Sequence, residues 1–255
     1  MCAKPGAPVK PARGGPLAFA TIRDSPTAAF PSLRARPAMN IEQARFNMIE
    51  QQIRTWEVLD TGVLDLLGRV KREDFVPAEH REIAFADLEI PLGHGEAMLQ
   101  PKIEARIVQE LAIQPQERVY EVGTGSGYLT ALLGSIAAHV TSAEIHADLL
   151  ARAHERLVAA GVENTTLIQG DSARAPLGEG AYDVIVLGGS VPFLPQPFLD
   201  RLRPGGRLFA VVGDRPVMKA LLVRHAVPNS FQHVELFETL LKPLENALQP
   251  ARFRF

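Results

Sequence analysis

Cysteine is almost absent from this chain, and its scarcity limits the chemistry that the protein can carry. The sequence of 255 residues contains one cysteine, Cys2, so no disulfide forms within the chain and no cysteine framework holds a metal. We therefore expect the function to use no bound metal. Such cysteine usage fits a reducing compartment, and we predict a cytoplasmic protein.

Long apolar runs and basic stripes are also missing. An apolar run such as residues 208–212 has the length of a strand, far below the ~20 residues that cross a bilayer. The net charge is −2, and no stripe of Lys and Arg with interleaved aromatic residues is present. The sequence therefore predicts neither a membrane partner nor a nucleic-acid partner, and the oligomeric state stays open.

Residues 1–38 differ in composition from the rest of the chain. They contain repeated prolines, several Lys and Arg residues and a single acidic residue, Asp24, and they show no helical or strand period. This composition predicts a disordered extension or an upstream over-call of the start site. Residues 39–255 are predicted to form one domain, with helices and a loop in residues 39–112 and the sheet in residues 113–255.

The first part of this domain has helical periodicity. Apolar residues at spacings of three and four predict a helix over residues 41–56, and Asp60 is placed to cap a second helix. Glu73 and Asp74 are assigned to a solvated turn. After a glycine-rich loop, Pro101 is placed to begin another helix.

Strand-like and helix-like segments alternate in the second part. Such alternation means parallel strands joined by helical crossovers. The predicted strands cover residues 118–122, 140–145, 166–171, 181–188, 207–213, 219–227 and 231–244, with residues 203–206 as the turn into the fifth. The last two strands read as a hairpin. We therefore predict an α/β protein with a doubly wound, mostly parallel seven-stranded sheet, N-terminal helices and an antiparallel C-terminal edge.

The most informative segment is residues 119–128, where three alternating glycines follow an apolar strand. Gly123, Gly125 and Gly127 let the backbone turn tightly and approach a ligand that any Cβ would exclude. Dinucleotide-binding glycines read G-x-G-x-x-G, and here the third glycine comes one residue early. Glu121 would repel a pyrophosphate and attract an ammonium or a sulfonium. The segment therefore predicts S-adenosylmethionine, which carries both cations and no phosphate, as the cofactor.

Two further acidic residues follow predicted strands. Glu144 ends a strand about twenty positions after the glycines, where a carboxylate is placed to accept hydrogen bonds from both ribose hydroxyls. A solvated carboxylate at a strand end is the alternative for Glu144. Asp171 ends the next strand in the same way. Because ligands of open parallel sheets bind at the carboxyl ends of the strands, Glu121, Glu144 and Asp171 predict one ligand site there.

These motifs resemble those of class I S-adenosylmethionine-dependent methyltransferases, whose first motif reads E/D-x-G-x-G-x-G. The resemblance implies a Rossmann-like fold and an acidic residue, here Asp171, beside the adenine, although Asp after Gly is equally ordinary turn chemistry. The predicted cofactor contacts are Glu121, Gly123, Thr124, Gly125, Gly127, Glu144, Ile145 and Asp171.

A narrower resemblance covers the chain from Met39 onward. The stretches Arg72-Glu-Asp-Phe-Val-Pro77, Ile90-Pro-Leu-Gly-His-Gly95 and Gln100-Pro101 are similar to the N-terminal signature of the protein-L-isoaspartate O-methyltransferase family. The resemblance implies a carboxyl O-methyltransferase that repairs damaged proteins by methylating L-isoaspartyl residues, with such proteins or peptides as partners. In that family the loop ahead of the cofactor strand closes over the active site. The predicted substrate pocket therefore comprises Asp87, His94, Gly95, Met98, Leu99 and Gln100.

Two departures from the family pattern concern the substrate. The family carries Thr-Ile-Ser in this loop and its serine is regarded as the active-site residue, whereas here Ala97 and Leu99 replace the threonine and the serine. The ending Lys242-Pro-Leu-Glu-Asn246 also differs from the family's Val-Pro-Leu-Thr type. The catalytic residue is therefore unassigned. We hypothesise that Ser190 partly replaces the hydroxyl lost at Leu99, with a chance position in a loop as the alternative.

Three alternatives to isoaspartyl methylation stay open. Because Met98 and Leu99 make the predicted pocket wall more apolar, the same fold suits a small or apolar acceptor. A catalytically weak, cofactor-binding scaffold is the second alternative. An NAD-dependent oxidoreductase is the third, disfavoured by the early third glycine and by Glu121. The absence of an obvious catalytic histidine or cysteine is not evidence against carboxyl methylation, because a carboxylate acceptor is already ionised near pH 7 and needs no general base.

Overall fold

A helical layer precedes the sheet in the computed structural model, which describes residues 40–227 and 230–250. Its elements are α1 (Ile41–Asn47), a π-helical turn (Met48–Ile53), a 3-10 turn (Arg54–Trp56) and α2 (Thr61–Arg69). The Asp60 carboxylate accepts hydrogen bonds from Gly62 N at 2.8 Å and Val63 N at 3.2 Å, so the predicted cap is confirmed. The predicted helix over residues 41–56 is helical throughout. The prediction for residues 1–38 lies outside the described residues.

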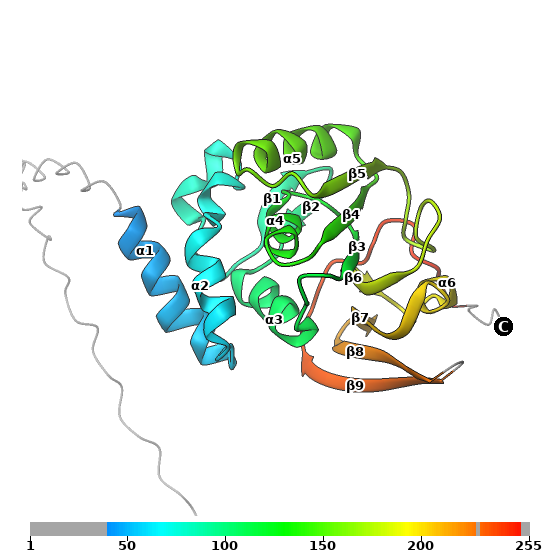
Figure 1. Cartoon of the computed structure of the whole chain (residues 1–255). Coiled ribbons are helices and arrows are strands. Elements are labelled where there is room, and N and C mark those ends of the chain that lie inside the picture. Colours follow the sequence, from blue (N-terminus) through cyan, green and yellow to red (C-terminus); the bar gives the residue numbers. More distant parts are fainter. Residues whose placement is uncertain (1–39, 228–229, 251–255) are drawn as a thin grey trace, which may run out of the picture. The chain divides into compact units, whose positions relative to one another are not determined.

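Seven strands form one mixed sheet in the order β5-β4-β3-β6-β7-β8-β9 (Figure 1). They are β3 (Arg118–Val122), β4 (His139–Glu144), β5 (Thr165–Gln169), β6 (Tyr182–Val191), β7 (Leu202–Asp214), β8 (Val217–Val227) and β9 (Ser230–Glu238). The strands from β5 to β7 in this order run parallel, and β8 and β9 add an antiparallel edge. The predicted fold is therefore confirmed.

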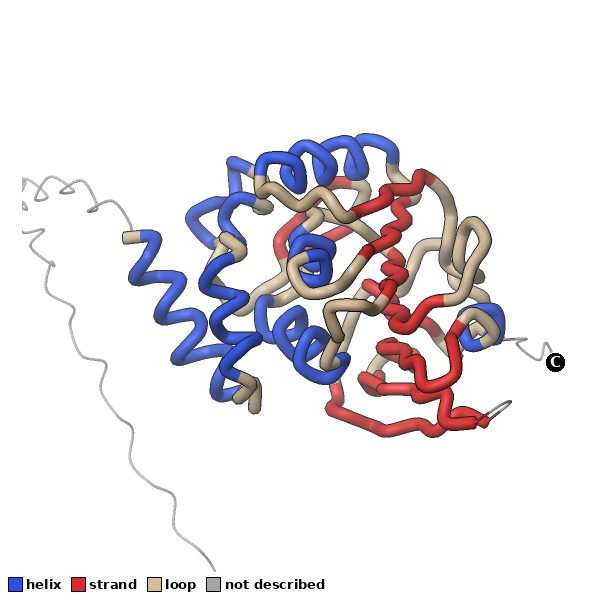
Figure 2. Tube along the Cα trace, viewed as in Figure 1, coloured by secondary structure: helices blue, strands red, loops and turns tan. Residues whose placement is uncertain are grey.

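The two faces of the sheet carry separate apolar cores, because side chains alternate along each strand. Val119 and Val184 belong to the larger core, and Tyr120 and Ile185 belong to the smaller one together with Phe198. The helices beside the sheet are α3 (Pro101–Leu111), α4 (Tyr128–Gly134), α5 (Ala147–Ala159) and α6 (Gln196–Leu199). Figure 2 shows most helices on one side of the sheet and α6 on the other. Burial on both faces explains the near-continuous apolar strands.

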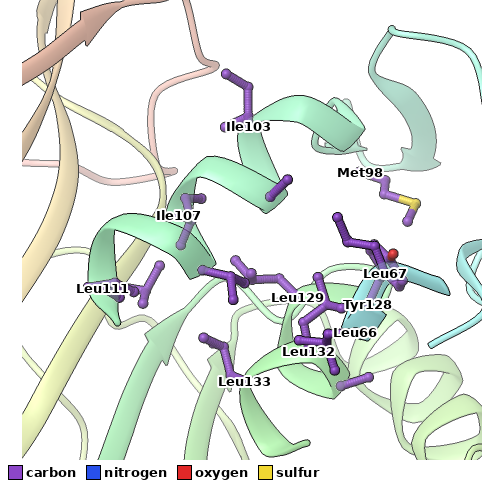
Figure 3. Close-up of a cluster of buried hydrophobic side chains, with 14 of the residues drawn as sticks. Leu66, Leu67, Met98, Ile103, Ile107, Leu111, Tyr128, Leu129, Leu132 and Leu133 are labelled. Carbon is purple, nitrogen blue, oxygen red and sulfur yellow. The ribbon is translucent and has the colours of Figure 1, made fainter. Parts of the chain in front are cut away.

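The larger core joins the helical layer to the sheet. Leu66 and Leu67 of α2 lie near Leu129 of α4, and α3 contributes Ile107 to the same cluster (Figure 3). Met98, in the loop ahead of α3, is 3% exposed and packs in this core. The loop is thus anchored to the interior at one end. None of the helices in the described part of the chain has the length and apolar character needed to cross a membrane.

Three local predictions differ from the structure. The loop ahead of α3 contains a hairpin of β1 (Ile90–Gly93) and β2 (Glu96–Met98), whose turn has a positive φ of 54° at His94. Residues 203–206 lie within β7 and not in a turn before it, because Leu202 already pairs with Tyr182 of β6. The last strand ends at Glu238, well before residue 244, and the chain then leaves the sheet edge.

Buried arginines connect the segments ahead of the sheet. Arg72 is fully buried; it contacts the Glu104 carboxyl group and donates to Ala84 O at 2.9 Å and to Leu99 O at 2.6 Å. Burial raises the pKa of Glu104 to about 8, against the attraction of Arg72, and either form of the carboxyl group accepts a hydrogen bond from the guanidinium. Arg72 therefore holds the loop at Leu99 against α3.

The neighbouring acidic residue corrects a sequence prediction. Glu73 is buried and ion-paired with Arg45 of α1, so its assignment to a solvated turn is wrong. The pairing joins residues far apart in the sequence, and local turn composition carries no signal of it. Asp74, next along the chain, is exposed as predicted.

We predict that Arg72→Met lowers the free energy of unfolding by about 3–5 kcal/mol, because it leaves a buried carboxyl group and two carbonyl oxygens without their donor. Urea titration followed by circular dichroism measures the loss. The control is Arg54→Met, which removes the exposed pair of Arg54 with Glu50 and should cost less than about 1 kcal/mol. Equal losses in both variants would contradict the role assigned to Arg72.

Candidate active site

A cleft opens at the carboxyl ends of the parallel strands. The chain leaves β3 toward β4 and β5 on one side and returns through β6 on the other, so the strand order reverses between β3 and β6. Ligands of open α/β sheets bind at such a point. The cleft encloses about 770 Å³, part of it open to solvent.

Glycines form the floor of the cleft. Gly123 and Gly125 line it with positive φ values of 90° and 53°, which a side chain would strain. Gly188, in β6 directly after its last pairing with β3, faces them, and a Cβ there would lie 2.7 Å from Val122 O. A side chain is therefore excluded at Gly188, and the glycine backbone lies open to a ligand in the cleft.

Glu144 stabilises the glycine turn and lines the cleft. Its carboxylate accepts hydrogen bonds from Gly125 N at 2.9 Å and from His146 N at 3.1 Å. The residue is 4% exposed, so it is not the solvated strand end that the sequence left as an alternative. A carboxylate accepts about four hydrogen bonds, and the two in use leave acceptor positions for ligand hydroxyls.

Asp171 lies farther along the same wall, next to the described C-terminal residues. Its carboxylate accepts hydrogen bonds from Ala173 N and from Asn246 Nδ2, each at 3.0 Å. The bond to Ala173 is the turn chemistry expected of an Asp after Gly. Asp171 also lines the cleft with Ile145 and Ser172, and its contact with a ligand stays a prediction.

Glu121 lies outside the residues that line the cleft. It is fully buried, and its Oε2 accepts hydrogen bonds from Thr130 Oγ1 at 2.5 Å and Ser142 Oγ at 2.7 Å. Its Oε1 has no partner among the described residues. Direct contact between Glu121 and a ligand therefore stays a prediction, and its observed contacts join β3, β4 and α4.

A segment after β9, residues 239–247, also contributes to the lining of the cleft. Ser190 makes three hydrogen bonds to this segment. Ser190 N donates to Lys242 O at 2.9 Å, and Leu244 N donates to Ser190 O at 2.9 Å. The Ser190 hydroxyl donates to Leu241 O at 3.1 Å. Lys242, Leu244 and Glu245 of this segment line the cleft, and Ser190 does not. The structure therefore does not bring the Ser190 hydroxyl into the site, and gives it an anchoring contact instead.

The predicted substrate residues separate into two groups. Leu99 lines the cleft and Met98 packs in the core, although both border a second, smaller hollow beside the glycine turn. Three of the others contact protein groups or lie at the surface: Asp87 pairs with Lys102, His94 lies 2.9 Å from Asp148, and Gly95 is in the exposed hairpin turn. Gln100 precedes α3 and lies outside the cleft lining.

Two predicted cofactor residues support the turn from outside the cleft. Thr124 is 3% exposed, and its hydroxyl lies 2.6 Å from Ser142 Oγ. Gly127 begins α4, where a Cβ would lie 3.2 Å from the Ala153 side chain of α5. Neither lines the cleft, so the structure brings together Gly123, Gly125, Glu144, Ile145, Asp171 and Leu99 from the predicted set.

Sequence reasoning missed several lining residues. They include Glu89, Glu96, Ser172, Gly188, Gly189 and Lys242. The Gly-Gly pair after an apolar strand and the unusual Lys242-Pro-Leu ending were the available signals. Their place in the cleft depends on the crossing of residues 239–247 over β6, which no local pattern predicts.

The charges of the cleft favour a cationic ligand. Five carboxylates line it, and Lys242 is the one basic side chain among the described residues that do so; the acidic residues are Glu89, Glu96, Glu144, Asp171 and Glu245. A pyrophosphate would meet repulsion from this set, whereas a sulfonium and an ammonium are attracted. The glycine floor, the free acceptor positions of Glu144 and the acidic lining therefore fit S-adenosylmethionine.

We predict a pH-dependent contribution of Glu121 to stability. Burial raises its pKa from 4.5 to about 7, helped by Glu144 and opposed by the hydrogen bonds from Thr130 and Ser142. The folded state therefore binds more protons, and stability from this group is present below pH 4.5 and lost as pH rises through 7. Relative to Glu121→Gln, the wild type should lose roughly 3 kcal/mol between these limits.

Urea unfolding of both proteins at several pH values from 5 to about 8 measures this difference. The glutamine variant supplies its own control, because all other titrating groups are shared. A stability difference that is constant with pH would show that Glu121 does not titrate as described.

Comparison with known proteins agrees with this geometry. The profile of the family described as protein-L-isoaspartate(D-aspartate) O-methyltransferase matches residues 43–244. Relatives of that name share 41% identity over 171 residues in Methanoculleus marisnigri, covering 67% of this chain and 78% of that protein, and 36% over 210 residues in Koribacter versatilis, covering 82% and 94%.

A solved structure is similar in fold. It is a putative protein-L-isoaspartate O-methyltransferase from Plasmodium falciparum in complex with S-adenosyl-L-homocysteine, with a TM-score of 0.69 and 21% identity. The similarity covers 81% of this chain and 99% of that one. On the family match and the identity of its relatives, the chain belongs to the protein-L-isoaspartate (D-aspartate) O-methyltransferase family.

Proposed function

We propose that this protein is an S-adenosylmethionine-dependent carboxyl O-methyltransferase that methylates L-isoaspartyl residues of damaged proteins for repair. Family membership confirms the predicted activity, enzyme class and cofactor. The observation that carries the proposal is the cleft between β3 and β6, which has a glycine floor and an acidic lining. We propose isoaspartyl proteins or peptides as its partners.

Several lining residues would hold the cofactor. Glu144 has acceptor positions left for the ribose hydroxyls, and Asp171 stands on the wall where we place the adenine. The backbone at Gly123 and Gly125 leaves room for close approach of the ligand. When bound, S-adenosylmethionine supplies an electrophilic methyl group on a positively charged sulfur.

The chain's own task is to align and desolvate the acceptor. An isoaspartyl carboxylate has a pKa near 4, so it is ionised at pH 7 and needs no general base. Leu92, Leu99 and Leu244 line the cleft with apolar surface, which excludes water from an attacking carboxylate. Arg72 fixes Leu99 through its carbonyl oxygen, so the wall nearest the hairpin is held in place.

The lining also favours one alternative acceptor class. Ala97 and Leu99 place apolar side chains at the two positions where the family's loop pattern has hydroxyls. This lining suits a small or apolar acceptor. Met98 does not add to this wall of the cleft, because its side chain is buried in the core. We retain isoaspartyl residues as the first acceptor because the family match spans the loop and the C-terminal segment.

We also propose a cytoplasmic location and a single methyltransferase domain over residues 39–255. The support for the location is the single cysteine of the sequence. The support for the domain is the larger core, which joins residues 39–112, including the active-site loop, to the cofactor-binding sheet of residues 113–255.

The direct test of the activity is methylation of a synthetic peptide. We expect ester formation on a peptide with one L-isoaspartyl residue and at least about 100-fold less on the same sequence with L-aspartate, because only one geometry brings the carboxylate into line. Labelled cofactor and base-labile ester release provide the measurement. Transfer to a different acceptor supports the small-molecule alternative, and cofactor binding without transfer supports the scaffold.

We predict that Glu144→Gln weakens binding of S-adenosylhomocysteine by about 10- to 100-fold, because hydrogen bonds from ribose hydroxyls to a charged acceptor are lost. Isothermal titration calorimetry measures the affinity, and circular dichroism checks that the turn at Gly125 survives. Glu155→Gln, on the exposed face of α5, is the matched control and should bind normally. Unchanged affinity in the Glu144 variant would place the ribose elsewhere.

A further inference from the structure

The acidic cleft that suits a cationic cofactor is unfavourable for the acceptor. An isoaspartyl residue presents a carboxylate, and five lining carboxylates repel it. The two hydroxyls that the family pattern places in the loop are replaced by Ala97 and Leu99. A group that attracts an anion is therefore required in the part of the cleft where these two residues lie.

Few side-chain donors are available there. Ser172 is the one hydroxyl residue among the described lining residues, and it already donates to Ala175 O at 2.8 Å and contacts Tyr120. Lys242 is the one cation among the same residues. Its position is the second departure from the family pattern, and its ion pair with Glu96 places it beside the hairpin where the hydroxyls are lost.

Lys242 reaches the hairpin that carries Ala97 and Leu99. Its ammonium is ion-paired with Glu96 of β2, and a Cβ on Gly95 would lie 3.8 Å from Lys242 Nζ. The side chain is 42% exposed, so the ammonium is accessible from the open part of the cleft. An ammonium has three donors, and the contact with Glu96 leaves others for a second carboxylate.

The backbone of Lys242 is fixed by β6. Ser190 N donates to Lys242 O, and the Ser190 hydroxyl donates to Leu241 O. Gly189 lets residues 239–247 pack closely on β6, because a Cβ at this position would lie 3.0 Å from Lys242 O. The ammonium is therefore carried by a segment that is held in place, as a specific substrate contact requires.

We propose that Lys242 binds the carboxylate of the acceptor residue and takes over the role of the missing loop hydroxyls. The proposal rests on the proposed isoaspartyl methyltransferase function and assigns its substrate-binding cation. Glu96 then has two effects. It positions the ammonium in the free protein, and it competes with the substrate carboxylate for that ammonium.

A metal is a weaker interpretation of the same region. Glu96, His146 and Glu245 bring ligand atoms within 4.8 Å of one another. Lys242 already supplies a positive charge to Glu96, so a metal ion there would meet a like charge. The arrangement therefore favours an incoming anion over a cation.

The test is equilibrium binding of a fluorescent isoaspartyl peptide to the protein saturated with S-adenosylhomocysteine, measured by anisotropy. A second peptide carries the same residue with the α-carboxylate replaced by a carboxamide. The variants are Lys242→Met, Lys242→Arg and Glu96→Gln. Lys219→Met is the matched control, because it removes another exposed lysine that pairs with a glutamate, Glu235 on β9.

We expect Lys242→Met to weaken binding of the carboxylate peptide about tenfold and to abolish the preference over the carboxamide. Lys242→Arg should bind within about threefold of the wild type, and Glu96→Gln should bind more tightly. Every variant is saturated with S-adenosylhomocysteine, so a change in peptide binding does not reflect a change in cofactor occupancy. Lys219→Met should behave as wild type.

Two results would overturn the proposal, and they differ. If the wild type methylates the peptide but Lys242→Met binds it normally, or if Lys242→Met and Glu96→Gln weaken binding equally, the pair is only a structural contact between hairpin and C-terminal segment. If the wild type binds S-adenosylhomocysteine but neither binds nor methylates the isoaspartyl peptide, the proposed function fails together with the assignment of Lys242.

Discussion

The structure depends on the close approach of β3 and β6 at their carboxyl ends. Gly188 faces Val122 O at a distance that leaves no room for a Cβ, and Gly123 continues the backbone at a positive φ. The strand order reverses at this point, so the loops after β3 and β6 part in opposite directions. The opening between them is the cleft. A side chain larger than hydrogen at Gly188 would force the two strands apart and change the site.

Charged side chains from different segments line the cleft. Glu144 and Asp171 come from neighbouring parallel strands, so their carboxylates lie on one wall and present negative potential to a cationic ligand. Lys242 lies on residues 239–247, a segment that also lines the cleft and that contacts Asp171 through Asn246. Support comes from outside the cleft, where Arg72 holds Leu99 and Ser190 holds the C-terminal segment. The lining of the cleft is thus held in place by contacts that lie outside it.

The sequence predicted the sheet and the acidic wall because both are local signals. Continuous apolar strands, the glycine turn and carboxylates at strand ends repeat at short range, and parallel pairing brings the ends together. Glu73, Ser190 and Lys242 could not be placed in this way. Their environments come from contacts with residues 28 to 146 positions away, such as Arg45 with Glu73 and Lys242 with Glu96. The contact of Glu121 with the cofactor stays a prediction; its side chain is buried, and its bonds to Thr130 and Ser142 join β3 to α4 and β4.

The most direct test of the acidic, glycine-floored cleft is a calorimetric titration of the purified protein with S-adenosylhomocysteine and, separately, with a nicotinamide dinucleotide. We expect one adenosyl ligand to bind per chain and the dinucleotide to give no heat, because its pyrophosphate would face the carboxylates of the cleft. Binding of the dinucleotide without binding of the adenosyl compound would contradict the assignment of the cleft.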